Sequence, residues 1–110
     1  MEHQIKEEQG NHIVLLQGEV DLESSPKARQ IMLDAVGRGK KILVDLTSVT
    51  YMDSSGIASL VEAFQRAKKK EIGFALVSVN PAVLRVLHLA RLDQVFIIHD
   101  NLESALNADI

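Results

Sequence analysis

Hydrophobic positions along the chain switch between two spacings, one that suits strands and one that suits helices. Near the start, the turn signal Gln9-Gly10-Asn11 separates a polar segment at roughly residues 3–8 from the apolar run Ile13 to Leu16. This order is typical of a β-hairpin, so we predict two antiparallel strands there. Three later apolar runs are also predicted to be strands: 41–46, 72–77 and 95–98.

Between these runs, apolar residues recur every three or four positions, which indicates helices packed against a sheet. The first helix opens at Ser24-Ser25-Pro26, where hydroxyl groups and Pro favour a helix start, and ends at Gly37. The second starts near Ile57 and ends in Lys68-Lys69-Lys70, which we interpret as a solvated helix end. Two more helices are predicted: one capped by Asn80-Pro81, and a short one at 102–106.

The order β-β-α-β-α-β-α-β-α defines the expected fold class. Strands that alternate with helices pair in parallel through right-handed crossovers. We therefore predict an α/β domain with a mixed, mostly parallel sheet, an amino-terminal hairpin and helices packed against the sheet. The nearly continuous apolar run at 41–46 is typical of a strand buried on both faces. No internal repeat or Pro/Ser/Gly-rich linker interrupts the chain, so a single domain over 1–110 is expected.

Composition narrows the function classes. Among 110 residues, 12 basic against 15 acidic residues leave a net charge of -3, so no basic surplus favours direct nucleic-acid binding. The chain has no Cys, and its four His lack metal-binding spacing, so neither a metal nor another cofactor is expected. Apolar runs stop after about four residues, and the amino terminus carries no secretory signal. We therefore expect a cytoplasmic protein without membrane insertion.

Candidate chemistry lies in the loop expected from Thr47 to Gly56, because ligands of open α/β sheets gather at the carboxyl ends of the strands. This loop contains Asp53-Ser54-Ser55-Gly56 directly before a helix. Taken alone, these residue types are typical of a helix cap, which leaves capping as an alternative to chemistry. Neither Ser has Gly two positions before it, so the nucleophile motif of serine hydrolases is absent and we predict no enzyme.

Three segments carry a resemblance to a known family. The stretch from Leu43 to Gly56 resembles the signature of the STAS domain in bacterial anti-sigma factor antagonists, also called anti-anti-sigma factors. Gly18-Glu19-Val20-Asp21 is similar to that family's Gly-Glu-Leu-Asp motif, with Val in place of Leu. The segment from Val79 to Phe96 is similar to its carboxyl-terminal third. The motifs are correctly ordered and spaced within a matching β/α order, and together they cover nearly the whole chain.

The resemblance implies a phosphorylation switch. In the family, the second Ser of the motif is phosphorylated by an anti-sigma factor that is itself an ATP-dependent serine kinase, and a serine phosphatase removes the phosphate. By position the acceptor is Ser55, with Ser54 its neighbour. The unphosphorylated protein binds the anti-sigma factor and so frees a sigma factor, whereas the phosphorylated form lets go. A hydroxyl at a helix amino terminus suits this role, because unpaired N–H groups and the helix dipole favour a phosphate there.

Two carboxylates are candidates for the same site. Asp21 ends the second strand, and its loop should lie beside the loop that carries Ser55. Asp21 and Asp53 are therefore expected to orient the hydroxyl or to contact the metal-nucleotide of the kinase. Their alternative role is that of cap and turn residues.

Roles are also expected for other residues of these segments. Gly56 lacks a Cβ, which would let a kinase loop approach the acceptor closely. Tyr51 and Met52 flank the site and either form the apolar part of a docking surface or pack in the core. Asp45 is expected to hold its loop by hydrogen bonds. Arg91 stands where the family commonly has Gly, so we expect a helix end there that differs from the usual left-handed Gly.

A second function from a different class stays open from the sequence. The chain is also compatible with a cytoplasmic STAS subunit of a membrane transport assembly for lipids or anions, which would act by docking without phosphorylation. The pair of Ser residues beside Asp21 favours the antagonist, because a docking subunit does not require an acceptor hydroxyl.

Overall fold

A computed structural model describes residues 1–108 and shows one five-stranded sheet in the order β1-β2-β3-β4-β5. β1 runs antiparallel to β2, and each later strand runs parallel to its neighbour. This confirms the α/β class, the amino-terminal hairpin and the mixed, mostly parallel sheet. The strands are β1 (Glu2–Glu8), β2 (Asn11–Val20), β3 (Lys41–Met52), β4 (Phe74–Val77) and β5 (Ile97–His99).

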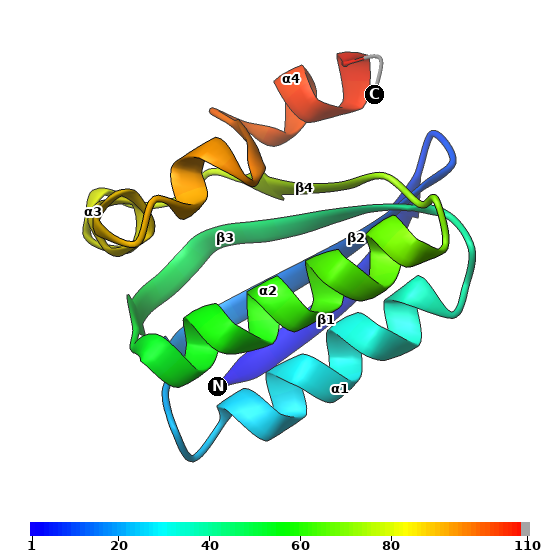
Figure 1. The fold of residues 1–110 in the computed structure, drawn as a ribbon. Helices are drawn as coiled ribbons and strands as arrows, with labels where there is room; N and C mark the ends of the chain where they lie inside the picture. Colours follow the sequence, from blue (N-terminus) through cyan, green and yellow to red (C-terminus); the bar gives the residue numbers. More distant parts are fainter. Residues whose placement is uncertain (109–110) are drawn as a thin grey trace.

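Helices cover both faces of the sheet (Figure 1). Two long helices lie side by side on one face, the last helix lies on the opposite face, and the third is seen end-on near the curved end of β3. No helix of residues 1–108 has the length and apolar character needed to cross a bilayer. The helices are α1 (Ser25–Val36), α2 (Ser54–Lys69), α3 (Pro81–Leu89) and α4 (Leu102–Asn107), with a short 3₁₀ turn at Leu92–Gln94 that the sequence pattern did not predict.

The core is divided by the sheet into two parts. Val14 and Val44 point to the larger cluster, which is shared with α1 and α2. Ile13 and Leu43 point to the smaller cluster, which includes Ala105 of α4. Because successive side chains of a strand alternate between faces, a strand covered by helices on both sides needs an unbroken apolar run. The apolar residues at 42–46 are accordingly buried, as predicted.

The loop predicted from Thr47 is wrong in its first half, because β3 continues as far as Met52. The second half of β3 stays paired with β2: Gln17 faces Ser48, and Val20 faces Met52. Two shifts of register let β3 take up extra residues against β2, and β3 curves at this end (Figure 1). Asp45 lies at the first shift and accepts hydrogen bonds from the N–H and the hydroxyl of Thr47, so its expected structural role is confirmed.

The helix end at Arg91 is a second correction. We expected a cap different from the usual left-handed Gly, but Arg91 itself has φ 60° and ψ 22°, which is the left-handed conformation. Its N–H donates to the carbonyl oxygen of His88, and the chain then turns directly into the 3₁₀ turn that starts at Leu92. The turn therefore imposes the conformation on Arg91, although a side chain makes it less favourable than for Gly.

Candidate functional site

The first turn of α2 is built around the carboxylate of Asp53. Asp53 precedes the helix in an extended conformation, and its Oδ1 accepts hydrogen bonds from the N–H groups of Ser55 at 2.9 Å and Gly56 at 3.2 Å. These two donors have no partner within the helix, so the carboxylate satisfies them as an N-cap. The helix consequently begins at Ser54, three residues earlier than the apolar spacing predicted.

The hydroxyl of Ser55 is held by the same carboxylate. Its Oγ donates to Oδ1 of Asp53 over 2.5 Å. This hydrogen bond is the main reason that the pKa of the Asp53 carboxyl lies below its ordinary value of 3.8, and the backbone donors lower it further. At neutral pH an ionised carboxylate therefore accepts the hydrogen bond from the hydroxyl of Ser55. Ser55 is partly exposed. Ser54 beside it is exposed to solvent, and no hydrogen bond joins its hydroxyl to Asp53.

The loop after β2 is joined to this cap. The N–H of Leu22 donates to Oδ2 of Asp53 over 3.1 Å, and the N–H of Asp53 donates to the carbonyl oxygen of Val20 over 3.3 Å. This confirms that the loop of Asp21 lies beside the loop of Ser55. Since Oδ1 caps α2 and Oδ2 holds the neighbouring loop, one side chain fixes both segments relative to each other.

The carboxylate of Asp21 organises its own loop. Oδ1 of Asp21 accepts from the N–H groups of Glu23 and Ser24 and from the Ser24 hydroxyl. The backbone hydrogen bond from Ser24 is the largest cause that lowers the pKa of Asp21 below its ordinary value of 3.8, against the nearby charge of Asp53, which raises it. Asp21 has no hydrogen bond to Ser55, so of the two carboxylates only Asp53 orients the hydroxyl.

Two of the predicted partner contacts face inward. Gly56 is buried, and a Cβ on it would lie 2.5 Å from Cγ of Met52 and 2.7 Å from the carbonyl oxygen of Val20. The missing side chain thus lets α2 approach the strands, and the prediction that it makes room for a kinase loop is wrong. Met52 is only 4% exposed, so of its two expected roles the structure supports packing in the core and not docking.

Two apolar side chains do reach the surface beside the acceptor. Tyr51, the last exposed residue of β3 before the cap, is 51% exposed, and Leu22 in the neighbouring loop is 77% exposed. Leu22 was not among the predicted site residues. The available signal was its position: it is the one apolar residue among the charged and polar residues from Asp21 to Ser25, between a strand and a helix.

A groove between α1 and α2 opens beside the acceptor. It has a volume of about 230 Å³, and Ser55, Ser59 and Glu62 of α2 line it opposite Ser25 and Arg29 of α1. Arg29 donates from Nε to the carboxylate of Glu62 across the groove, and the two side chains are 45% and 42% exposed. The groove therefore holds one cation and one anion beside the hydroxyl of Ser55.

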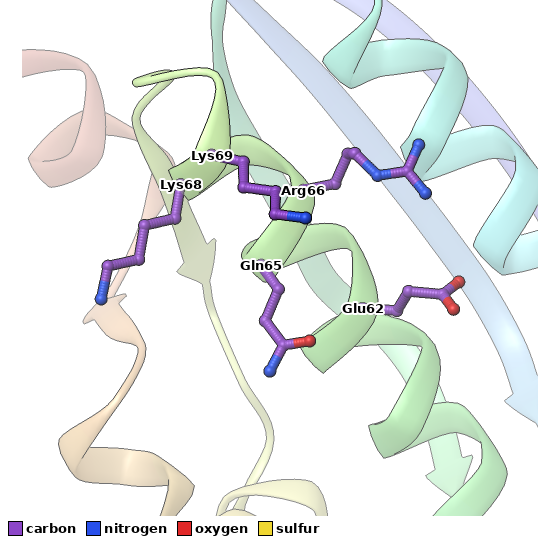
Figure 2. A pocket seen from close by; sticks show the side chains of 5 residues that line it. All are labelled: Glu62, Gln65, Arg66, Lys68 and Lys69. Atoms are coloured by element: carbon purple, nitrogen blue, oxygen red, sulfur yellow. The ribbon is translucent and has the colours of Figure 1, made fainter.

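A larger hollow of about 530 Å³ lies along the other half of α2 (Figure 2). All five lining residues belong to this one helix, and Figure 2 shows Arg66 and Glu62 extending toward α1 while Lys68 extends to the opposite side. The hollow is the space between diverging surface side chains, so it brings no groups from different elements together. The acceptor end of α2 is the better candidate site despite its smaller groove.

Comparisons with known proteins identify the family of the chain and several relatives. The STAS domain family matches residues 3–105. The chain is 33% identical over 108 residues to an anti-sigma F factor antagonist from Paenibacillus polymyxa, covering 96% of this chain and 89% of that protein. It is 29% identical over 108 residues to an anti-sigma-B factor antagonist from Listeria monocytogenes, covering 96% and 94%. The crystal structure of an anti-sigma factor antagonist from Mycobacterium paratuberculosis has a TM-score of 0.88 at 27% identity, covering 96% and 90%.

Proposed function

The chain belongs to the STAS domain family, as its motifs predicted, and from that premise we propose that it is an anti-sigma factor antagonist switched by phosphorylation of Ser55. In this function it is a binding protein and a substrate, and it does not itself catalyse a reaction. The unphosphorylated form binds an anti-sigma factor that is also a serine kinase, and a serine phosphatase restores that form. Sigma factors act on transcription, so the proposed location is the cytoplasm.

One observation carries the assignment of Ser55. Its hydroxyl is partly exposed in the first turn of α2 and is held 2.5 Å from the carboxylate of Asp53. Ser54 is more exposed, but no hydrogen bond from the described residues 1–108 fixes its hydroxyl. Phosphoryl transfer depends mainly on positioning, because the kinase supplies the metal ions and most of the charge stabilisation. A hydroxyl whose oxygen is already fixed relative to a helix terminus suits such a substrate.

The transfer itself places each group as follows. The Ser55 oxygen forms a bond to the γ-phosphorus of ATP while the bond between that phosphorus and the β-phosphate oxygen breaks, which leaves ADP. The hydroxyl proton leaves toward a base, and the Asp53 carboxylate already accepts its hydrogen bond. A phosphatase reverses the change by transferring the phosphoryl group to water. Asp21 does not contact the hydroxyl, so its proposed contact is with the metal-nucleotide of the kinase.

Charge explains why the modified form dissociates. Phosphorylation adds about −1.5 to −2 charges at neutral pH. It would do so beside Asp53, whose lowered pKa keeps it ionised, and close to Asp21, whose pKa is lowered too. Before modification, the exposed side chains of Leu22 and Tyr51 offer an apolar surface next to the hydroxyl. We propose that this surface docks on the anti-sigma factor. A phosphate beside it would have to lose water when the two proteins bind, which makes binding unfavourable.

Incubation with candidate anti-sigma factor kinases and ATP, read by intact-mass spectrometry, tests the acceptor. We expect one phosphoryl group on the unaltered chain and on Ser54→Ala, and none on Ser55→Ala. Phosphate on Ser55→Ala equal to that on the unaltered chain would overturn the assignment. Calorimetry measures the affinity for the anti-sigma factor, which we expect Ser55→Ala to keep and phosphorylation to weaken. Equal affinity of the phosphorylated and unphosphorylated chains would contradict release by charge.

The alternative of a transport-assembly subunit is not favoured. The relatives reported above are antagonists of anti-sigma factors, and the chain matches each over 96% of its own length. In addition, a docking subunit gives no reason for a hydroxyl held against an ionised carboxylate at an exposed helix terminus.

A further inference from the structure

We propose that Arg29 binds a phosphoryl group on Ser55 and that its ion pair with Glu62 breaks when it does so. The inference rests on the proposed function, because it concerns the phosphorylated form of the same site. It assigns a role to the groove between α1 and α2, which neither the motif nor the acceptor hydroxyl explains. In this role Arg29 is the residue of the chain that binds the phosphoryl group carried by Ser55.

The first support is the place of Arg29 in the groove. Ser55, Ser59 and Glu62 recur at helical spacing on the face of α2 that lines the groove, and Arg29 lies opposite them on α1. Among the side chains that line this groove, Arg29 is the cation. Phosphate groups bind Arg in preference to most side chains, because the guanidinium presents two parallel N–H donors to two phosphate oxygens.

The second support is that the carboxylate of Asp53 would repel a phosphate on Ser55. Phosphorylation replaces the hydroxyl proton of Ser55, so the hydrogen bond to Asp53 is lost and two anions face each other where a bond had been. Asp53 is fixed by Leu22 and by its capping contacts and cannot turn away without giving these up. The phosphate is therefore repelled from Asp53. The groove, which Ser55 lines and Asp53 does not, contains the positive charge of Arg29.

The third support is that Arg29 can leave its present partner easily. Its ion pair with Glu62 is exposed on both sides, and ion pairs of this kind contribute little to stability. Side chains on a helix lean toward its amino terminus. The α1 residue one turn before Arg29 in that direction is Ser25, which also lines the groove with Ser55. A change of rotamer, without movement of α1, would therefore carry the guanidinium toward the acceptor.

The change of partner has a consequence for the surface. When Arg29 turns to the phosphate, the carboxylate of Glu62 loses its partner and adds an unpaired negative charge along the same groove. The phosphorylated form would then present the carboxylate of Glu62 in addition to the phosphate to an approaching anti-sigma factor. The switch thus includes a rearrangement of side chains on α1 and α2 besides the new charge on Ser55.

The test uses the full chain with phosphoserine genetically encoded at position 55, so that no kinase is needed. The second pKa of the phosphate is measured by ³¹P NMR titration. Arg29 favours the dianion, so we expect Arg29→Ala to raise this pKa by about half a unit, roughly a threefold change in proton affinity. Glu62→Gln, which removes the competing carboxylate, should not raise it. Lys27→Ala is the matched control, because Lys27 is an exposed cation on the same helix that does not line the groove.

The outcomes separate the two proposals. An equal phosphate pKa in the parent, Arg29→Ala and Lys27→Ala would overturn the role of Arg29, whatever a kinase does. A raised pKa in Arg29→Ala alone supports it even if every candidate kinase leaves Ser55 unmodified, in which case the proposed function would be the one that failed. The ¹⁵Nε signal of Arg29 gives a second readout: it should shift when phosphoserine replaces Ser55, and no shift would count against the contact.

Discussion

At the amino end of α2, groups from three segments are joined by hydrogen bonds, whereas at its carboxyl end the charges of a single helix spread into solvent. Asp53 binds its own helix and the loop of Leu22, and the N–H of Asp53 is bonded to Val20 of β2. At the other end, within residues 1–108, no ion pair engages the lysines at 68–70. The amino end has a groove of about 230 Å³ and the carboxyl end a hollow of about 530 Å³.

The difference shows which property marks a site in this molecule. Neither the density of charge nor the size of the hollow does so, because both are greater at the carboxyl end. What distinguishes the amino end is that residues far apart in the sequence fix one another, as Leu22 and Asp53 do. A hydroxyl held by a hydrogen bond and an apolar side chain on an anchored loop can be recognised with little loss of conformational entropy, whereas long exposed lysine side chains lose more. The predictions below test whether this contrast holds.

The largest expected effect is the replacement Gly56→Ala. The new Cβ would lie 2.7 Å from the carbonyl oxygen of Val20, so α2 and β2 must move apart. We expect a loss of about 2 kcal/mol in the free energy of unfolding, even though Ala favours a helix over Gly by about 1 kcal/mol. Urea denaturation measures this, with Ser54→Ala as the control in the same turn. Equal stability of the two variants would show that the amino end is less tightly packed than its contacts indicate.

Leu22→Ser should weaken binding of the anti-sigma factor about tenfold while the unfolding transition stays nearly unchanged. The side chain is 77% exposed, so its loss removes contact with the partner and little of the core. Leu89→Ser is the matched control, because Leu89 is 75% exposed and belongs to α3, which contributes no residue to the groove beside Ser55. Calorimetric titration with the anti-sigma factor measures the affinity of both variants, and urea denaturation measures their stability. A similar loss in the two variants would mean that binding does not select the amino end of α2.

Asp53→Ala is expected to lower Tm by roughly 5 °C, because the cap of α2 and the link to Leu22 are lost together. Asp53→Asn keeps an acceptor oxygen and should lower Tm less. Asp34→Ala, which removes an exposed carboxylate of α1 that accepts a hydrogen bond from Gln30, provides the comparison. If both carboxylates prove equally dispensable, the hydrogen bonds at the amino end do not hold its segments together.

The pH dependence of stability tests the same carboxylate. The pKa of Asp53 is lower in the folded chain than its ordinary value of 3.8, so between these values the unfolded chain binds more protons. Its contribution is therefore complete above pH 3.8 and is lost as the pH falls through the folded pKa. Thermal melts should show a difference between the parent chain and Asp53→Asn that shrinks below pH 3.8. A constant difference would contradict the lowered pKa.

The same contrast explains how far the sequence could predict the structure. The hairpin, the four helices and the parallel order follow from local patterns, and these predictions are confirmed. The second half of β3 was missed because Thr47, Ser48 and Thr50 carry no apolar pattern, and what makes them a strand is pairing with β2. Ser55 could be chosen as a candidate because the cap and its motif lie within one short segment.

The neighbouring positions of the Asp21 and Ser55 loops could be predicted, but the individual contacts between distant segments could not. The role of Gly56 depends on Val20, which lies in another strand, and no local rule indicates how closely α2 approaches it. Met52 was left between docking and packing, since its face of β3 is fixed only by the register shifts against β2. Leu22 has no periodic partner in the sequence, and only its hydrogen bond to Asp53 shows that it belongs to the site.

The smallest effect is expected at the carboxyl end of α2, from the double variant Lys68→Ala/Lys69→Ala. Both side chains are exposed and diverge in Figure 2, so their removal should change the free energy of unfolding by no more than about 0.5 kcal/mol. Binding of the anti-sigma factor should also stay within about twofold, because a partner centred on Leu22 and Ser55 meets the opposite end of the helix. Urea denaturation and calorimetric titration measure the two quantities. A tenfold loss of affinity would extend the interface along the whole of α2, and the contrast between its two ends would then no longer define the site.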